Sequence, residues 1–153
     1  MLCEGAMPQS LEERYDPTVT EGFIGASDSL TGLPAYLGFR IVDGGPGTMR
    51  AEMAVAEELL TPFGNIHGGV ISALCDHVLG CVCYPLMKRG QWAATTEFKV
   101  NLLAPVSTGT LTADATVASI TRTQAVVRIE ISNEGRLAAL AQGTVTIRDP
   151  KGA

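Results

Sequence analysis

The run IHGGVISALCDHVLGCVCYPL, residues 66–86, decides the fold of this 153-residue chain. It predicts one long helix that ends near Pro85 and the segment 88–90, because Pro, Lys, Arg and Gly are typical of a helix C-terminus. Its apolar residues leave no polar stripe; they are Val70, Ile71, Ala73, Leu74, Val78, Leu79, Cys81, Val82 and Cys83. A helix that is apolar on nearly every side has to be surrounded by other elements.

Six segments around this helix have the composition or the alternation of β-strands. The predicted strands are residues 39–43, 48–55, 93–103, 109–121, 124–133 and 137–148. Asn133, Glu134 and Gly135 form a hairpin signal, and the alternation before them indicates antiparallel strands with one face in water. One domain with about six antiparallel strands and one apolar helix predicts an α+β fold in which the sheet curls around the helix, the hotdog architecture.

Length and composition favour a single globular domain. Hydrophobic residues make up 46% of the chain and charged residues 18%, which is ordinary for a packed core. We assign residues 33–149 to this domain, opening with a short helix over residues 33–38. Residues 1–32 have scattered Pro, Gly, Ser and acidic positions, so we expect a partly flexible N-terminal arm with a short helix at residues 11–15.

Charge and cysteine content limit the partners and the compartment. A net charge of −5 argues against nucleic acid as a partner. The N-terminus lacks the pattern of a secretory signal, and three of the four cysteines lie in one helical run, so we expect reduced thiols and a cytoplasmic location. The apolar run 70–87 contains Asp76, whose insertion into lipid would cost about 2.5–3.5 kcal/mol, so we expect a buried helix and no membrane partner.

The first candidate catalytic residues lie where the loop before the long helix ends. Gly68 and Gly69 follow His67 at the predicted helix start, so their amides belong to the donors that have no partner within the helix. Such donors, aided by the helix dipole, stabilise a carbonyl oxygen as it becomes negative. The alternative is that the two glycines only permit close packing of the helix.

Asp76 is the only acidic residue in the apolar run. A buried carboxylate is unfavourable, so we expect burial to raise its pKa and a nearby helix N-terminus to lower it, leaving a base or a nucleophile. The alternative is a structural carboxylate bound to backbone amides or to a cation. Eight residues of helix span about 12 Å, so Gly68 and Asp76 of one chain cannot reach the same carbonyl, whereas two copies related by a two-fold axis could supply one each.

The segment from His67 to Asp76 resembles the signature of the PaaI-like acyl-CoA thioesterases. The resemblance extends from about residue 33 to residue 148 and includes the strand ATTEFKVNLLAP, residues 94–105. It implies that the Gly68 amide polarises the thioester carbonyl while Asp76 of the partner chain activates water or attacks directly. It further implies that Thr95 orients that water and that His67 shapes the loop, with a secondary possibility of acting as a general base.

The resemblance also suggests substrate-binding positions, with one departure from the family pattern. Some members place Asn or Gln six residues before the His to hold the carbonyl; here that position is Thr61, and Asn65 is nearby but out of register. We expect Gly69, the second residue of the glycine pair, to be a further substrate-binding position. Arg122 matches a position that is often basic in the family and could meet the phosphates of coenzyme A, the alternative being a solvated turn cation.

Other chemistries have weaker support in the sequence. Cys75, Asp76 and His77 are adjacent on a helix and point about 100° apart, so they cannot form a relay. His77 and Cys81 lack further ligands at metal-binding spacing, and we expect no metal or cofactor. We therefore expect hydrolysis of acyl-CoA thioesters by a homodimer or homotetramer. The alternatives are a non-catalytic acyl-CoA binding or sensing protein and a hotdog hydratase or dehydratase, although the latter would need Asp and His in a short loop.

Overall fold

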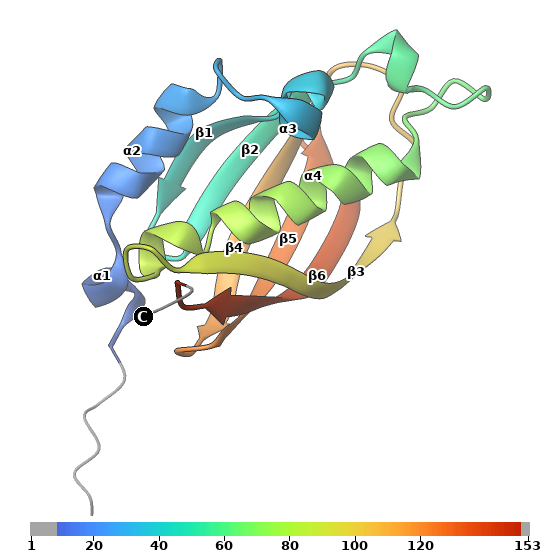
Figure 1. The fold of residues 1–153 in the computed structure, drawn as a ribbon. Coiled ribbons are helices and arrows are strands. Elements are labelled where there is room, and N and C mark those ends of the chain that lie inside the picture. Colours follow the sequence, from blue (N-terminus) through green and yellow to red (C-terminus); the bar gives the residue numbers. More distant parts are fainter. Residues whose placement is uncertain (1–8, 151–153) are drawn as a thin grey trace, which may run out of the picture.

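A computed structural model describes residues 9–150, in which a six-stranded antiparallel sheet curls around one long helix, α4 (Figure 1). The strands are β1 (Arg40–Gly45), β2 (Thr48–Ala54), β3 (Trp92–Leu102), β4 (Thr110–Ile120), β5 (Gln124–Asn133) and β6 (Arg136–Arg148). All six predicted strands are confirmed, with boundaries that differ by a residue or two. The predicted hotdog architecture of the α+β class is likewise confirmed.

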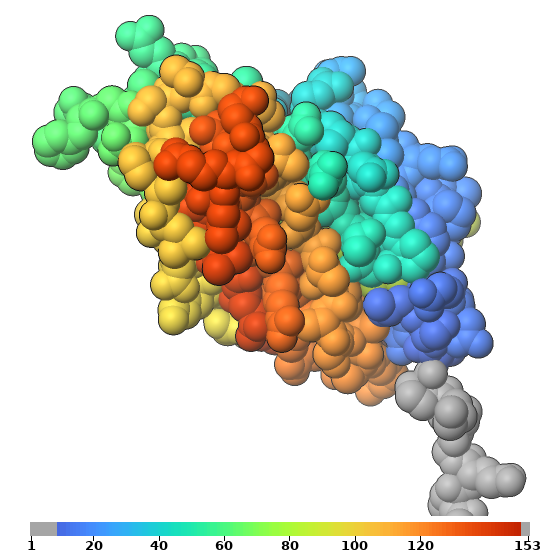
Figure 2. Space-filling view, turned by 180° about the vertical axis from the view of Figure 1, so that it is seen from behind, coloured from blue at the N-terminus to red at the C-terminus, as the bar shows by residue number. Residues whose placement is uncertain are grey.

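The order of the strands leaves β3 at one edge of the sheet. The sheet runs β1-β2-β4-β5-β6-β3, so the chain leaves β2, passes through α4 and returns on the opposite side to pair with β6. The other edge of β3 has no strand partner within residues 9–150. Seen from behind, the outer face of the sheet forms the back of the molecule, with the blue N-terminal helices at the β1 side (Figure 2).

Helix α4 is shorter than predicted. It extends over Gly68–Cys81 and is followed by a separate 3₁₀ turn, η2 (Tyr84–Leu86), because Pro85 lacks the N–H that would continue the α-helix. The whole run 68–86 is long and apolar enough to cross a membrane by composition, but 56% of its most apolar window is buried in the fold, and the core helix of a globular protein passes the same test.

The sheet also covers less of the surface of α4 than predicted. Leu74, Cys75, Val78 and Leu79 are fully buried against the inner face of the sheet, whereas Asp76 on the opposite side is exposed. The expectation that Asp76 is buried is therefore wrong for the single protomer. A sheet curled around a helix covers the helix on one side only, and the helical period cannot reveal which stripe stays uncovered.

Between residue 9 and the sheet lie three short helices: α1 (Leu11–Arg14), α2 (Pro17–Ala26) and α3 (Gly32–Leu37). The predicted short helices at 11–15 and 33–38 are confirmed, but a loosely tied arm does not describe α2. Thr20 on α2 is 3% exposed, and Ser27 after it donates to the Ile41 carbonyl and accepts from the Ile41 amide. Residues 9–31 are thus attached to β1, while residues 1–8 of the expected arm lie outside the described residues.

Candidate active site

His67 is the N-cap of α4. Its Nδ1 atom accepts a hydrogen bond of 2.9 Å from the Gly69 amide. An imidazole nitrogen that accepts a hydrogen bond carries no proton, so the proton of the neutral ring lies on Nε2. The Gly69 amide therefore already has a hydrogen-bond acceptor within the protomer, because the His67 ring folds back onto it.

The neighbouring Gly68 amide is different. Gly68 is the first residue of α4, and its N–H donates a hydrogen bond to none of the residues 9–150. Its carbonyl, in contrast, accepts a hydrogen bond of 2.9 Å from the Ser72 hydroxyl. Space beside Gly68 is limited, since a Cβ atom there would lie 2.6 Å from Cδ1 of Leu102. The helix thus presents one free backbone donor, reinforced by the positive end of its dipole.

Asp76 faces an open hollow between α4 and β3. The hollow has a volume of about 600 Å³ and is lined by Gly69, Ser72, Ala73, Asp76 and residues 95–98. Thr95 and Asp76 are thus brought together, as the resemblance implied for a water-binding pair. Gly68 does not line this hollow, and the uninterrupted helix between Gly68 and Asp76 separates them by about 12 Å.

A β-bulge shapes the wall of this hollow. The register between β3 and β6 shifts between Thr95 and Glu97, so Thr96 is an extra residue in β3. Glu97 accepts a hydrogen bond of 2.8 Å from the Thr144 hydroxyl. Glu97 is a second carboxylate that lines the hollow and that the sequence analysis missed; because the bulge at Thr96 breaks the alternation of β3, its position relative to Thr95 could not be read from the spacing.

Thr61 and Asn65 lie in the loop before α4 and do not line the Asp76 hollow. The Thr61 amide donates to the Asn65 carbonyl at 2.7 Å, and the Thr61 hydroxyl accepts from the Phe63 amide at 3.3 Å. The Thr61 side chain thus closes a local turn. Asn65 lines a separate small cavity with Ile66, Ile71 and residues 102–106.

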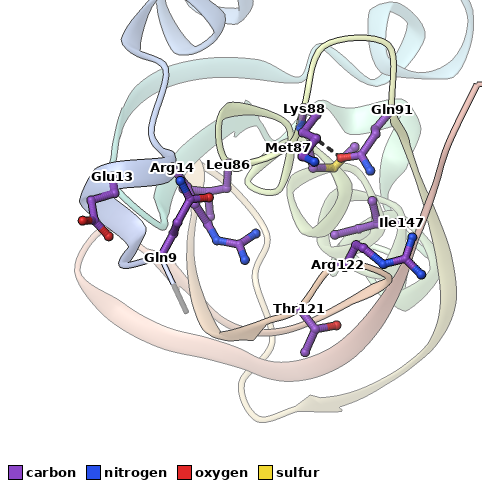
Figure 3. A pocket seen from close by; sticks show the side chains of 10 residues that line it. All are labelled: Gln9, Glu13, Arg14, Leu86, Met87, Lys88, Gln91, Thr121, Arg122 and Ile147. Carbon is purple, nitrogen blue, oxygen red and sulfur yellow. Dashed lines mark hydrogen bonds between the residues drawn. The ribbon is translucent and has the colours of Figure 1, made fainter. Parts of the chain in front are cut away.

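Arg122 also lies away from the Asp76 hollow. It is an exposed residue of the turn between β4 and β5 and forms an ion pair of 3.7 Å with Asp149. It lines a cavity with Leu86 and Lys88, which follow the C-terminal end of α4 in the chain (Figure 3). One protomer therefore does not bring Arg122 together with Gly68.

The thiols of α4 do not supply an alternative nucleophile. Burial, together with the charge of Asp76, raises the pKa of Cys75 to about 12, so its reactive thiolate is scarce at neutral pH. Burial likewise lowers the pKa of His77, whose ring packs against Phe39 with centroids 5.2 Å apart. Residues 9–150 contain no cluster of three or more side chains that could hold a metal ion.

Comparison with known proteins identifies the family. Residues 63–139 match the thioesterase superfamily. A putative esterase of Haemophilus influenzae is 30% identical over 117 residues, covering 74% of this chain and 83% of that protein. A 1,4-dihydroxy-2-naphthoyl-CoA hydrolase of Listeria monocytogenes is 27% identical over 118 residues, covering 76% of this chain and 96% of that protein.

The fold has matches of the same kind among solved structures. The PaaI protein of E. coli superimposes with a TM-score of 0.77 at 24% identity, over 87% of this chain and 96% of that one. The resemblance inferred from the segment 67–76 is thereby confirmed. By its fold and by the match over residues 63–139, the chain belongs to the thioesterase superfamily and is a hotdog-fold thioester hydrolase.

Proposed function

We propose that this protein hydrolyses acyl-CoA thioesters at two equivalent sites, each formed between two protomers. The Gly68 amide of one protomer holds the thioester carbonyl oxygen, and Asp76 and Thr95 of the other activate the attacking water. The observation that carries this proposal is the pairing of a free backbone donor at Gly68 with an exposed carboxylate about 12 Å away on the same helix. One protomer cannot use both on one carbonyl.

The proposed reaction is a direct hydrolysis. The Asp76 carboxylate removes a proton from a water that also hydrogen-bonds to Thr95, and the water oxygen bonds to the carbonyl carbon. The carbonyl electron pair moves onto oxygen, where the Gly68 N–H and the dipole of α4 stabilise the charge. When the carbonyl reforms, the C–S bond breaks, and the departing thiolate takes the proton from Asp76.

Two features support a second copy of the chain as the partner. Among residues 9–150, no strand pairs with the outer edge of β3, and pairing with a second copy there would extend the sheet across a two-fold axis. The open face of α4 lies beside that edge, since Asp76 and β3 residues line the same hollow.

Coenzyme A as the thiol carrier is supported by the named substrate of the Listeria relative. Such substrates fit a cytoplasmic location, and pairs of dimers would give the tetramer.

The first test compares wild type with Asp76→Asn on short, medium, long and phenylacetyl thioesters of coenzyme A, following thiol release. Asn has the shape of Asp but cannot take a proton, so kcat should fall by about 10³-fold. Glu97→Gln is the matched control: it neutralises the other carboxylate of the hollow, whose Thr144 bond is structural, and activity should stay within about tenfold of wild type.

Two outcomes would contradict the proposal. If wild type binds acyl-CoA but releases no thiol from any thioester, the protein is a binder and not a hydrolase. If a single turnover in ¹⁸O-labelled water places the label in the Asp76 carboxylate, Asp76 attacks the carbonyl directly and does not act through water. We expect the label in the released acid alone.

A further inference from the structure

A groove on the outer face of the sheet takes no part in the proposed reaction. It has a volume of about 250 Å³ and extends over β5, β6 and β3 on the side turned away from α4, the side seen in Figure 2. Two rows of exposed side chains line it, and each row is formed by paired positions on the three strands. The basic row consists of Arg128, Gln142 and Lys99, and the acidic row consists of Glu130, Leu140 and Asn101.

The charged side chains of the two rows are not paired with each other. Arg128 and Glu130 are alternate residues of β5, so they stand on the same face, about 7 Å apart along the strand. No ion pair among residues 9–150 includes either of them or Lys99. Beside Glu130, the large apolar side chain of Leu140 is 38% exposed. Opposite charges that stay separate around an exposed apolar side chain leave this face able to bind a surface of complementary charge.

A copy of this face, turned by half a rotation, has that complementary charge. A two-fold axis that crosses the strands between the two rows, at the level of Ile129, exchanges the basic and acidic rows of two sheets that face each other. Arg128 of one copy then lies opposite Glu130 of the other, and the same rotation forms this pair a second time. Packed sheets keep their strands within about 30° of one another, so the rows stay opposed over the short width of the groove.

The dimer of the proposed function sets the level of its own axis along β3. Gly68 lies beside Leu102, and Asp76 lies beside residues 95–98, so α4 and β3 run in opposite directions. The helical residues from Gly68 to Asp76 span about 12 Å, which equals about four residues of strand. An axis that brings Gly68 of one copy to Asp76 of the other passes halfway between them, close to the level of Val100.

The two axes lie at the same level of the sheet. Val100 pairs with Ala141 of β6, and Ala141 pairs with Ile129 of β5, the level that separates the basic row from the acidic row. The axis of the dimer is perpendicular to the sheet, because it relates the antiparallel edges of two β3 strands, whereas the axis between facing sheets is parallel to the sheet. Perpendicular two-fold axes that meet generate a closed tetramer.

We propose that two dimers pair through this groove, outer sheet face against outer sheet face, with Arg128 of each protomer bound to Glu130 of the protomer opposite. The partner is a second dimer of the same chain, so this inference rests on the dimer of the proposed function. The α4 helices and the Asp76 hollows then lie on the outside of the tetramer. Substrate reaches them without any change in the dimer–dimer contact.

A charge swap tests the contact, with association measured by analytical ultracentrifugation. Arg128→Glu and Glu130→Arg each place like charges opposite one another, so the Kd of the dimer–dimer equilibrium should rise at least about 100-fold. The double variant Arg128→Glu/Glu130→Arg exchanges the charges and restores the pairing, so its Kd should return to within about tenfold of wild type. Arg89→Glu makes the same charge change at an exposed residue outside the groove and should change the Kd by less than about twofold.

Thiol release separates this contact from the proposed hydrolysis. The dimers of Arg128→Glu keep complete sites, so their kcat should stay within about twofold of wild type, and melting temperatures check that their fold is intact. If both single variants associate as wild type does, or if the double variant stays as dissociated as they are, the groove is not the dimer–dimer contact. Thiol release by wild type would in that case leave the proposed hydrolysis standing, and a successful swap in a protein that releases no thiol would leave the contact standing.

Discussion

His67 and Gly68 divide two tasks at the N-terminus of α4. His67 caps the helix through its bond to the Gly69 amide, and this leaves Gly68 as the free donor. The cap also occupies the nitrogen that His67 would need as a base on that side of the ring. The geometry therefore favours a structural role for His67.

Replacing His67 separates capping from base catalysis. Asn is among the best N-cap residues but cannot act as a base. The unfolding free energy of His67→Asn should therefore lie within about 0.5 kcal/mol of the wild-type value, and its kcat should stay within about tenfold of wild type. His67→Ala removes the cap and should lose about 1 kcal/mol of unfolding free energy, measured by urea denaturation. A fall in kcat of about 10³-fold in His67→Asn with normal stability would instead assign proton transfer to His67.

At the level of single residues, the sequence predicted where the candidate groups lie in the elements better than it predicted their surroundings. The helix-start position of Gly68 and the isolation of Asp76 in an apolar run could both be read from spacing. The exposure of Asp76 could not, because the helical period does not tell which stripe of α4 the sheet leaves open. The hydrogen bond from the Gly69 amide depends on the orientation of the His67 ring, which no sequence pattern encodes.

Among the elements, β3 and β6 depend on a glycine for their close packing on α4. A Cβ atom at Gly143 would overlap Cδ1 of Leu79 on α4 and would lie 2.6 Å from Cβ of Phe98 and 2.8 Å from the backbone oxygen of Glu97. The last contact is with the bulged part of β3 that carries Thr95. Rigid backbone cannot yield as a side chain can, so β3 itself would have to move.

We therefore expect Gly143→Ala to lower the unfolding free energy by about 1–3 kcal/mol and to reduce kcat, because displacing the bulge displaces Thr95. Gly22→Ala is the control, because Gly22 lies in α2 with nothing within 4 Å of the added Cβ. The unfolding free energy of this variant should rise by about 0.5–1 kcal/mol. Urea denaturation and thiol release measure both effects. A stable, fully active Gly143→Ala would mean that α4 and β3 are less tightly packed than in this structure.

The strands were easier to predict than the helices for physical reasons. Alternation along residues 124–133 reports directly which side chains face the core, and Glu134 and Gly135 have the positive φ angles of 49° and 79° that a two-residue hairpin turn needs. Helix α2 was missed because its two glycines and two threonines give it low propensity, so tertiary packing on β1 determines it. Asp16 followed by Pro17 was a usable start signal, since Asp16 caps the Thr18 amide.

At the scale of the whole molecule, one protomer keeps the proposed catalytic groups apart, at two separate positions along α4. The Gly68 amide and the Asp76 hollow lie at successive positions along α4, and in the proposed reaction they act on the same carbonyl. A two-fold axis beside β3 would turn the α4 helices antiparallel and bring Gly68 of one copy toward Asp76 of the other. Assembly would then be part of catalysis, because each copy completes its partner.

Mixing two inactive variants tests this arrangement. Gly68→Pro removes the N–H and adds a Cβ near Leu102, but it keeps the helix start: proline is tolerated at the first position of a helix, and His67 already has the extended ψ of 133° that a residue before proline needs. Gly68→Ala has the same clash with Leu102 but keeps the N–H, so it should remain much more active.

Unfolding Gly68→Pro and Asp76→Asn together and refolding them forms mixed dimers with one intact site and one doubly defective site. Half of the dimers are mixed after random pairing, so thiol release should recover to about a quarter of the wild-type rate, against almost none for either variant alone. Recovery requires that Gly68 and Asp76 of one site come from different copies. If the mixture stays as inactive as its components while size measurements show that mixed dimers form, each protomer would have to bend α4 or move β3 to build a site alone.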